Sequence, residues 1–337
     1  MSILVTGATG YIGSHVTLEL LKQGYDIVLL DNLSNSKISV VDSLSQLTGK
    51  ELSLYKVDLL NVDDLEKVFA ENKIEGVIHF AGFKSVEESI QKPLKYYHNN
   101  VGGLLNLCKT MMKFGVKNIV FSSSATVYGN KNKSPLTEEM DLSTINPYGT
   151  TKLMCEGILR DLYTSDNSWS INILRYFNPV GADQSGLIGE DPTHDPTNIM
   201  PIINKVASGK IEKIYIFGND YDTPDGTCIR DFIHVTDLAQ GHIKAIEKNQ
   251  TEKGLRIYNL GTGRGYSVME LIKTFEKSTG MKVPYEFVGR RSGDVDVCYA
   301  NPGKSLLEMG WEAEHNLAQM CEDSWRWEQT TKINPGD

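Results

Sequence analysis

A glycine-rich turn near the N-terminus constrains how this chain folds more than any other stretch. Residues 7–13 read G-A-T-G-Y-I-G, after the apolar segment 3–5 and before an expected helix over 14–22. Glycines at this spacing allow a tight turn and a close approach of the backbone to a pyrophosphate, whose charge the helix N-terminus then faces. A second expected strand, 26–30, ends in Asp31. An acid there hydrogen-bonds the ribose diol and repels a 2′-phosphate, which favours NAD over NADP.

Apolar strands and amphipathic helices continue to alternate along the first half of the chain. We expect strands at 52–57, 76–80, 118–121 and 171–175, and helices at 62–71, 93–114 and 148–164. This alternation is typical of an α/β protein with a doubly wound parallel sheet, in which ligands bind beyond the carboxyl ends of the strands. The residues at those ends are Asp31, Asp58, 80–84, 122–124 and 176–178.

The second half of the sequence has a different composition and less regular periodicity. Residues 181–198 are rich in Gly, Asp, Pro and Thr and show little periodicity. We therefore expect a Rossmann-type NAD-binding domain over 1–178 and a smaller mixed α/β substrate domain over 179–337. Its expected elements are a strand at 214–217 and helices at 236–248 and 268–279. We also expect 228–235 to form a strand that returns to the large sheet, so that 228–248 joins the first domain.

Three side chains form the candidate catalytic group. Ser124 follows an expected strand, and Tyr148 and Lys152 lie four residues apart on an expected helix. A spacing of four places both on one helical face. An ammonium near a phenol lowers the phenol pKa from about 10, so Tyr148 is predicted to act as a base near neutral pH. We expect Tyr128, which lacks a lysine four residues on, and His79 at a strand end to be structural.

Composition narrows the class of protein. The 337 residues carry a net charge of −9, which argues against nucleic-acid binding. No apolar run approaches the roughly 20 residues of a transmembrane helix, and the N-terminus lacks the features of a signal peptide. Five cysteines are scattered without a C-x-x-C pair. We expect reduced thiols, no metal site and a cytoplasmic location.

Nine segments together resemble a family of extended short-chain dehydrogenases/reductases, the UDP-hexose 4-epimerases. They are V-T-G-A-T-G-Y-I-G-S-H at 5–15, L-D-N-L at 30–33, H-F-A-G-F-K at 79–84, S-S-S-A-T-V-Y-G at 122–129, R-Y-F-N-P-V-G-A at 175–182, G-E-D-P at 189–192, I-F-G-N-D-Y at 216–221, I-R-D-F-I-H-V at 229–235 and R-R-S-G-D at 290–294. The resemblance implies a tightly held NAD, a UDP-hexose substrate, inversion at C4 through a 4-keto sugar, a role in galactose metabolism and a homodimer.

The same resemblance assigns roles to individual residues. It implies that Tyr148 is the base, that Ser124 relays or orients the proton, and that Lys152 holds the nicotinamide ribose. The implied cofactor contacts are Gly7, Gly10, Tyr11, Ile12, Gly13, Asp31, Asn32, Asn35, Ser36, Asp58, Leu59, Phe80, Ala81, Gly82, Lys84, Asn99, Ser122, Tyr148, Lys152, Tyr176 and Phe177. The implied substrate contacts are Lys84, Ser124, Tyr148, Asn178, Asn198, Ile199, Tyr215, Ile216, Phe217, Arg230, Phe232, Val268, Arg291, Asp294 and Cys298.

Two of these assignments have a physical basis of their own. The guanidinium forks of Arg230 and Arg291 suit a diphosphate despite the acidic net charge. Cys298 stands where relatives restricted to plain hexoses resemble one another in carrying Tyr, so a thiol there implies room for an N-acetyl group. The alternative that Tyr299 fills the same space stays open.

Two rival functions compete with the epimerase. A 4,6-dehydratase of the same superfamily has Asp-Glu after its strand-end hydroxyl, whereas Ser124 is followed by Ala125 and Thr126. A non-catalytic NAD-binding sensor typically loses the Tyr or the Lys, and both Tyr148 and Lys152 are present. The sequence favours the enzyme over both rivals.

Overall fold

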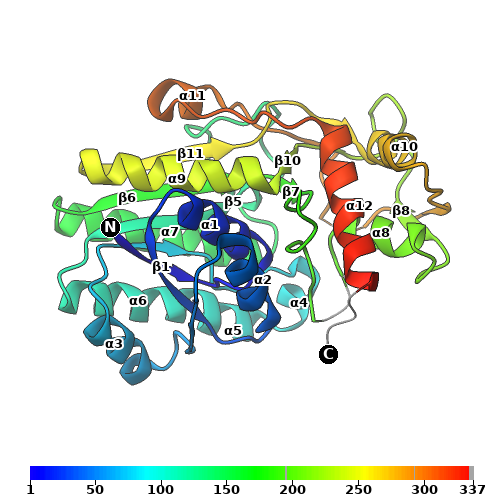
Figure 1. The fold of residues 1–337 in the computed structure, drawn as a ribbon. Helices are drawn as coiled ribbons and strands as arrows, with labels where there is room; N and C mark the ends of the chain where they lie inside the picture. The colour runs from blue at the N-terminus through cyan, green and yellow to red at the C-terminus, as the bar shows by residue number, and fades with distance from the viewer. Residues whose placement is uncertain (194–195, 292, 334–337) are drawn as a thin grey trace.

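A seven-stranded parallel sheet forms the centre of the computed structural model, which describes residues 1–193, 196–291 and 293–333 (Figure 1). Its strands, in spatial order, are β11 (Gly254–Leu260), β6 (Ser170–Tyr176), β5 (Asn118–Ser124), β4 (Gly76–His79), β1 (Ser2–Thr6), β2 (Asp26–Asp31) and β3 (Leu54–Lys56). The strand order changes direction between β1 and β4, which is where doubly wound sheets bind ligands. The predicted α/β class and doubly wound sheet are confirmed.

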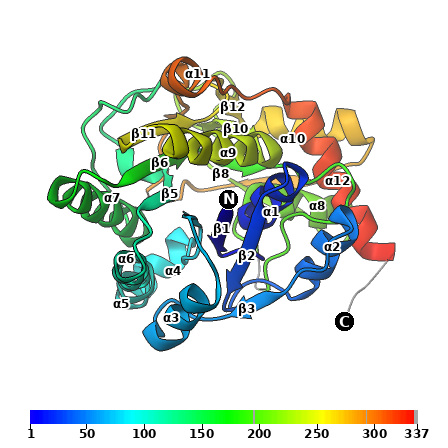
Figure 2. The same ribbon diagram turned by 60° about the vertical axis from the view of Figure 1, so that its left-hand side comes forward.

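Helices cover both faces of this sheet (Figures 1 and 2). One face carries α3 (Val62–Glu71), α6 (Gly102–Lys113) and α7 (Pro147–Ser165), and the other carries α1 (Tyr11–Lys22), α2 (Ser39–Thr48) and α9 (Val235–Thr251). On α6, the fully buried Leu104, Leu107 and Met111 recur at helical spacing. Burying each such side chain stabilises the fold by about 1.5–3 kcal/mol.

The helix expected over 93–114 forms, but one of its turns is wider than an α-helical turn. It consists of α5 (Pro93–Tyr96), a π-helical turn (Tyr97–Val101) and α6, and the shorter α4 (Val86–Gln91) precedes it. Asn100 in the wide turn accepts from the Phe83 N–H at 2.8 Å and donates to the Phe83 carbonyl at 3.0 Å. The wide turn therefore anchors the loop that follows β4, and such turns are frequent at functional sites.

Three short sheets lie beside the large sheet within the described residues. They pair β7 (Asn178–Val180) with β10 (Phe232–His234), β8 (Ile214–Phe217) with β13 (Tyr285–Val288), and β9 (Ile229–Arg230) with β12 (Tyr266–Ser267) and β14 (Val297–Cys298). The helices α8 (Ile199–Ala207), α10 (Val268–Thr279) and α12 (Leu317–Ile333) accompany these sheets, whereas α11 (Gly303–Met309) packs against β11 and α9 (Figure 1). The predicted strand at 214–217 and helix at 268–279 match β8 and α10.

The expectation that 228–235 forms one strand of the large sheet is wrong. Asp231 separates β9 from β10, because its buried carboxylate accepts from the N–H groups of Thr262, Gly263 and Ala300. The strand that rejoins the large sheet is β11, which follows α9 and pairs with β6. The helix predicted at 236–248 is present as α9, which lies between β10 and β11 and packs on the large sheet.

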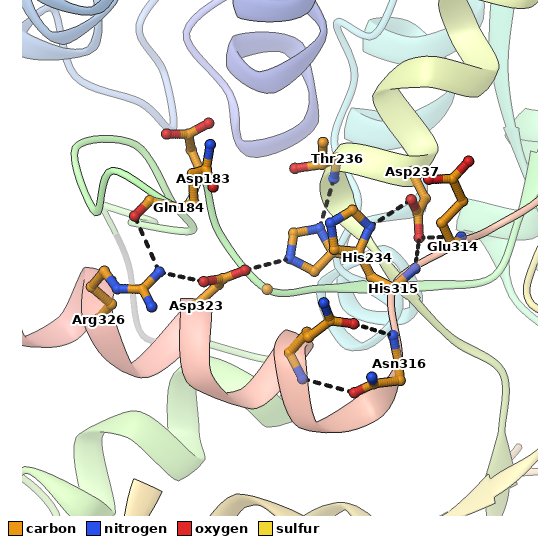
Figure 3. A network of polar contacts seen from close by, with 12 residues as sticks. Asp183, Gln184, His234, Thr236, Asp237, Glu314, His315, Asn316, Asp323 and Arg326 are labelled. Atoms are coloured by element: carbon orange, nitrogen blue, oxygen red, sulfur yellow. Dashed lines mark hydrogen bonds and ion pairs between the residues drawn. The ribbon is translucent and has the colours of Figure 1, made fainter. Parts of the chain in front are cut away.

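Helix α12 is connected to the glycine-rich turn through His234, whose contact with Asp323 of α12 is drawn in Figure 3. The Nε2 of His234 lies 3.3 Å from the Oδ2 of Asp323 on α12. The His234 ring packs against Gly181, where φ is +91° and a Cβ would lie 2.7 Å from Nε2. The carbonyl of Gly181 in turn accepts a 2.7 Å hydrogen bond from the Tyr11 hydroxyl. The C-terminal helix thus braces the turn between β1 and α1.

A second histidine in this cluster makes stability depend on pH. His315 stacks on His234 with ring centroids 4.3 Å apart, and its Nδ1 lies 2.7 Å from the Oδ1 of Asp237 (Figure 3). The hydrogen bond to Asp237 raises the pKa of His315 above the usual 6.5, against the effect of burial. A raised folded-state pKa gives stability that is fully present below the unfolded value and is lost as pH rises through the folded value.

We therefore expect His315→Asn to lower the melting temperature more in acid than in base. The loss in free energy of unfolding should be about 1 kcal/mol or less near pH 6, because the pair is partly exposed. Melting curves of both proteins at about pH 6 and about pH 9 check this. A difference that grows toward high pH would contradict it.

Candidate active site

Ser124, Tyr148 and Lys152 meet where β5 ends beside the first turns of α7. The Oδ1 of Asn146 caps α7 by accepting from the Gly149 N–H at 2.8 Å, which places Tyr148 in the first turn. Tyr148 is hydrogen-bonded to Ser124. The Lys152 ammonium donates to the Ser122 carbonyl at 2.7 Å and lies 6.0 Å from the centroid of the Tyr148 ring. A hydroxyl, a phenol and an ammonium therefore share one edge of the sheet.

The acid–base state of this group differs from the sequence-based expectation. Burial raises the pKa of Tyr148 to about 12, and the hydrogen bond to Ser124 only partly offsets that rise. The expected lowering of the Tyr148 pKa by Lys152 is not found, because the ammonium lies 6.0 Å from the ring and donates to the main chain instead. Burial lowers the pKa of Lys152 itself to about 8. The resting site is a neutral phenol beside an ammonium, and a cation against the phenol would lower the phenol pKa.

The side chains of His79 and Tyr176, near Lys152, are uncharged and have a structural role. His79 accepts or donates a 2.7 Å hydrogen bond with Thr6, and burial followed by the Lys152 charge lowers the pKa of His79 to about 3. Tyr176 is hydrogen-bonded to the Ser122 hydroxyl, and burial raises its pKa well above 10. The placement of His79 is the structural one expected from the sequence.

The glycine-rich turn is shaped as a dinucleotide cradle. Gly7 has φ +72°, and a Cβ on it would lie 2.8 Å from the Ala81 nitrogen. A Cβ on Gly13 would lie 2.1 Å from the Gly7 carbonyl oxygen. Gly10, the residue before α1, supplies no capping side chain, so the first N–H groups of the helix are open to an anion. These features fit the pyrophosphate of NAD.

Asp31 retains the capacity to bind a ribose. Its Oδ1 accepts from the Leu33 N–H at 2.8 Å and from the Ser36 hydroxyl at 3.3 Å, and its Oδ2 accepts from the Thr9 N–H at 3.2 Å. A carboxylate offers about four acceptor positions, so Oδ2 keeps one for a hydroxyl donor. The buried acid at the end of β2 therefore fits the ribose of NAD.

The remaining cofactor candidates lie around the same edge. Asn32 donates to Asp58 at 2.9 Å, Asn35 accepts from Thr193 at 3.2 Å, and Asn99 donates to Asn100 at 3.0 Å. Lys84 is engaged by Glu190 at 2.7 Å, and Asn198 donates to the same oxygen at 2.6 Å. Lys84 must share or leave Glu190 to contact a ligand.

The two candidate phosphate-binding arginines are held together by one acid. The Oδ1 of Asp294 lies 3.5 Å from Arg230 and 3.0 Å from Arg291. The Arg291 guanidinium lies 5.4 Å from the centroid of the Phe217 ring, which is exposed together with Tyr215 on β8. The arrangement offers two cations and a flat aromatic surface to a nucleotide.

The other residues predicted to contact a ligand differ in how buried their side chains are. The side chains of Leu59, Phe177, Ile216 and Phe232 are buried in apolar clusters. Ile199 and Val268 are partly buried and pack against the core of the smaller unit. Asn178 is exposed at the start of β7.

Sequence reasoning missed a buried ion pair behind the site. Glu156 and Arg175 are both fully buried, and their side chains meet at 2.7 Å. Two signals were available: Glu156 continues the four-residue spacing of Tyr148 and Lys152, and Arg175 interrupts an apolar strand. Tyr128, expected to be structural, lies in this cluster and donates to Asn259 at 2.7 Å.

The described residues contain five free cysteines and no group of three or more His, Cys, Asp or Glu arranged to hold a metal ion. Within the same residues, every helix is too short or too polar to cross a bilayer.

The fold and the Ser-Tyr-Lys group define an extended short-chain dehydrogenase/reductase. A family model described as the NAD dependent epimerase/dehydratase family matches residues 3–261. The chain belongs to this family, whose cofactor is NAD, and the cradle and Asp31 fit that cofactor.

Individual relatives match the chain over its whole length. It is 58% identical over 334 residues to the UDP-glucose 4-epimerase of Bacillus subtilis (strain 168), covering 99% of this chain and 98% of the relative. A crystal structure of UDP-glucose 4-epimerase from Bifidobacterium longum in complex with NAD+ and UDP superposes with a TM-score of 0.95 at 49% identity, covering 99% of both chains. A structure from Stenotrophomonas maltophila with bound NAD and formylated UDP-arabinopyranose gives 0.97 at 44% identity, again covering 99% of both.

Proposed function

We propose that this chain interconverts UDP-galactose and UDP-glucose by inverting C4 of the hexose, as an NAD-dependent 4-epimerase of galactose metabolism. The observation that carries the proposal is the meeting of Ser124, Tyr148 and Lys152 at the end of β5, in a chain of this family. Full-length similarity to UDP-glucose 4-epimerases supports the choice of substrate.

The side chains present perform the acid–base part of such a reaction. Bound NAD supplies the acceptor and the source of the C4 hydride. Tyr148 takes the proton of the 4-hydroxyl as the hydride leaves, Ser124 orients the hydroxyl, and the Lys152 charge favours the phenolate. After the 4-keto sugar has turned over, the hydride returns to the opposite face of C4 and Tyr148 returns the proton to the carbonyl oxygen. Because the protonated Lys152 is needed throughout, activity should decline above its pKa of about 8.

NAD and the UDP-sugar bind to different parts of the chain in this proposal. We assign NAD to residues 1–178 together with α9 and β11, and the UDP-sugar to the rest of 179–337. Arg230 and Arg291 suit the diphosphate, and Phe217 offers a stacking surface for uracil. Firm binding of UDP and loose binding of the hexose allow the keto sugar to turn without escaping. Free thiols and a nucleotide-sugar substrate fit a cytoplasmic enzyme.

Two measurements on the purified protein test this function. Heat or acid release should yield close to one NAD or NADH per chain, and UDP-galactose should be converted to UDP-glucose in an assay coupled to UDP-glucose oxidation. A 4-keto-6-deoxy product would support the dehydratase instead. Bound NAD without turnover of either sugar nucleotide would support the sensor.

A specific feature favours a second substrate pair, UDP-N-acetylgalactosamine and UDP-N-acetylglucosamine. Cys298 is partly buried and packs against the apolar cluster that contains Val127, Tyr128 and Phe177. The Tyr299 ring points elsewhere, since its Cδ1 lies 3.2 Å from where a Gly265 Cβ would be. The small thiol therefore supports room for an acetamido group on this wall.

We expect Cys298→Tyr to lose most activity toward UDP-N-acetylgalactosamine and to keep activity toward UDP-galactose. A phenol ring would fill the space through which the 2-acetamido group sweeps as the sugar turns over. The measurement is kcat/KM for both substrates in wild type, Cys298→Tyr and the small-residue control Cys298→Ser. A wild type inert toward the N-acetyl substrate, or equal losses on both substrates, would end this proposal.

We also propose a homodimer, formed through the helices at one side of the sheet. Leu94 on α5 is 81% exposed, and Leu105 and Met112 on α6 and Met154 on α7 are also exposed. Large exposed apolar side chains on these helices support an interface between chains.

Leu94→Glu should therefore weaken self-association by at least about 100-fold, since each interface loses two apolar contacts of about 1.5 kcal/mol each. Sedimentation at several concentrations measures this, with the exposed Leu307→Glu on α11 as the matched control. A Leu94→Glu protein that sediments as wild type would rule out this interface.

A further inference from the structure

Glu156 extends the row formed by the candidate base and its lysine. Tyr148, Lys152 and Glu156 follow one another at a spacing of four on α7, so they lie on one face of the helix. Glu156 is fully buried. The row therefore places a carboxylate one helical turn beyond the ammonium that the reaction needs.

The carboxylate is bound by side chains from two strands of the sheet. The Nε of Arg175 on β6 lies 3.0 Å from its Oε1 and the Nη2 lies 2.7 Å from its Oε2, which is a bidentate pair. The hydroxyl of Ser123 on β5 donates to Oε1 at 2.6 Å. Arg160, whose side chain is exposed, lies 3.5 Å from Oε2. Arg175 also donates to the Tyr128 hydroxyl at 3.1 Å, so both members of the pair are satisfied.

The other titratable groups around Lys152 carry no charge near neutral pH. On α7, burial raises the pKa of the Cys155 thiol to about 12 and that of Tyr148 to about 12. His79 on β4 is neutral because burial lowers its pKa to about 3, and Tyr176 on β6 is neutral because burial raises its pKa. From β5, Lys152 faces the Ser122 carbonyl and the Phe121 ring.

Among the described residues around Lys152, Glu156 is therefore the charged group that favours the protonated amine, and it is paired with Arg175 and, at its outer side, with Arg160. The guanidinium of Arg175 cannot release its proton in a protein. If the carboxylate were neutral, two cations would lie buried together. Lys152 is the one of the two that can discharge, and it would do so by losing its proton.

We propose that Glu156 is a positioning residue for the reaction, which keeps Lys152 protonated and thereby sets the upper pH limit of turnover. The proposal rests on the function proposed above, because it acts through Lys152 on the base Tyr148. It assigns to the buried ion pair a role beyond holding α7 against β5 and β6.

The test is the pH profile of kcat for UDP-galactose in the NAD-loaded Glu156→Gln enzyme. The alkaline limb should move to lower pH by at least about one unit, because a full charge one helical turn away is worth more than that even at an effective dielectric of about 20. KM should stay near the wild-type value, since Glu156 does not touch substrate. Bound NAD, measured after denaturation, should remain close to one per chain.

Glu156→Asp is the matched control, because it disturbs the packing and the bidentate geometry while keeping the charge. Its limb should stay at the wild-type pH even if kcat falls. If Glu156→Gln yields too little folded protein, Arg175→Gln tests the same idea with the opposite sign, since it keeps the carboxylate and removes the cation. Its limb should move to higher pH.

Three outcomes would overturn the proposal: a Glu156→Gln limb at the wild-type pH, equal shifts in Glu156→Gln and Glu156→Asp, or a downward shift in Arg175→Gln. A wild type that turns over no UDP-hexose would instead sink the proposed function, so the two failures are distinguishable.

Discussion

Tyr148→Phe is expected to lower kcat for UDP-galactose by about 10²–10⁴-fold, the usual contribution of a positioned acid–base group. Phenylalanine keeps the ring that packs at the start of α7 and removes only the hydroxyl that is hydrogen-bonded to Ser124. Binding should survive, because the cradle at Gly7 and Gly13 and the arginines at the nucleotide end are untouched. The measurement is steady-state turnover together with bound NAD and the Kd for UDP.

A second variant tests the role of Ser124 separately from that of the base Tyr148. Ser124→Ala should lose less activity than Tyr148→Phe, because the phenol remains and only its hydrogen bond goes. Wild-type-like turnover in Tyr148→Phe would refute the assignment of the base. A Ser124→Ala enzyme as inactive as Tyr148→Phe would make the serine hydroxyl a proton carrier in its own right.

Gly13→Ala is expected to remove NAD from the purified protein and, with it, all turnover. The new Cβ would lie 2.1 Å from the Gly7 carbonyl oxygen, a backbone atom that can move only if the turn opens. An opened turn loses the close approach of the backbone to the pyrophosphate. Nucleotide released on denaturation measures the loss, and Gly13→Ala protein that retains a full complement of NAD would contradict the fit of the cradle.

The control substitution is made at a helical glycine with free space around its Cα. A Cβ added at Gly157 on α7 would meet no atom within 4 Å. Gly157→Ala should therefore keep its NAD and raise stability by about 0.5–1 kcal/mol, because alanine favours a helix over glycine. The same chemical change at two positions thus separates a turn that requires glycine from a helix that tolerates any small residue.

The first half of the fold and most of the site edge followed from sequence alone because each signal there is local. A glycine-rich turn, an apolar strand and an acid at its end are contiguous, and parallel strands bring their ends to one edge. The convergence of Asp31, Ser124 and the loop after β4 required no knowledge of long-range contacts. The same logic placed Tyr148 and Lys152 on one helical face.

The failures come from long-range interactions that no local pattern encodes. The segment 228–235 is apolar enough to be one strand, but Asp231 is bound by Thr262 and Ala300 far along the chain, and the strand breaks there. The pKa of Tyr148 depends on how deeply the helix buries it, which spacing alone does not specify. The pair of Glu156 and Arg175 was visible as two unusual residues, but only the sheet register brings them together.

The brace between α12 and the glycine-rich turn joins segments that lie far apart in the sequence. Tyr11 donates to the Gly181 carbonyl, and Asp323 contacts His234, whose ring packs against Gly181. Displacing α12 would remove the support of His234 behind Gly181. The shape of the dinucleotide cradle therefore depends on a distant helix as well as on its own glycines.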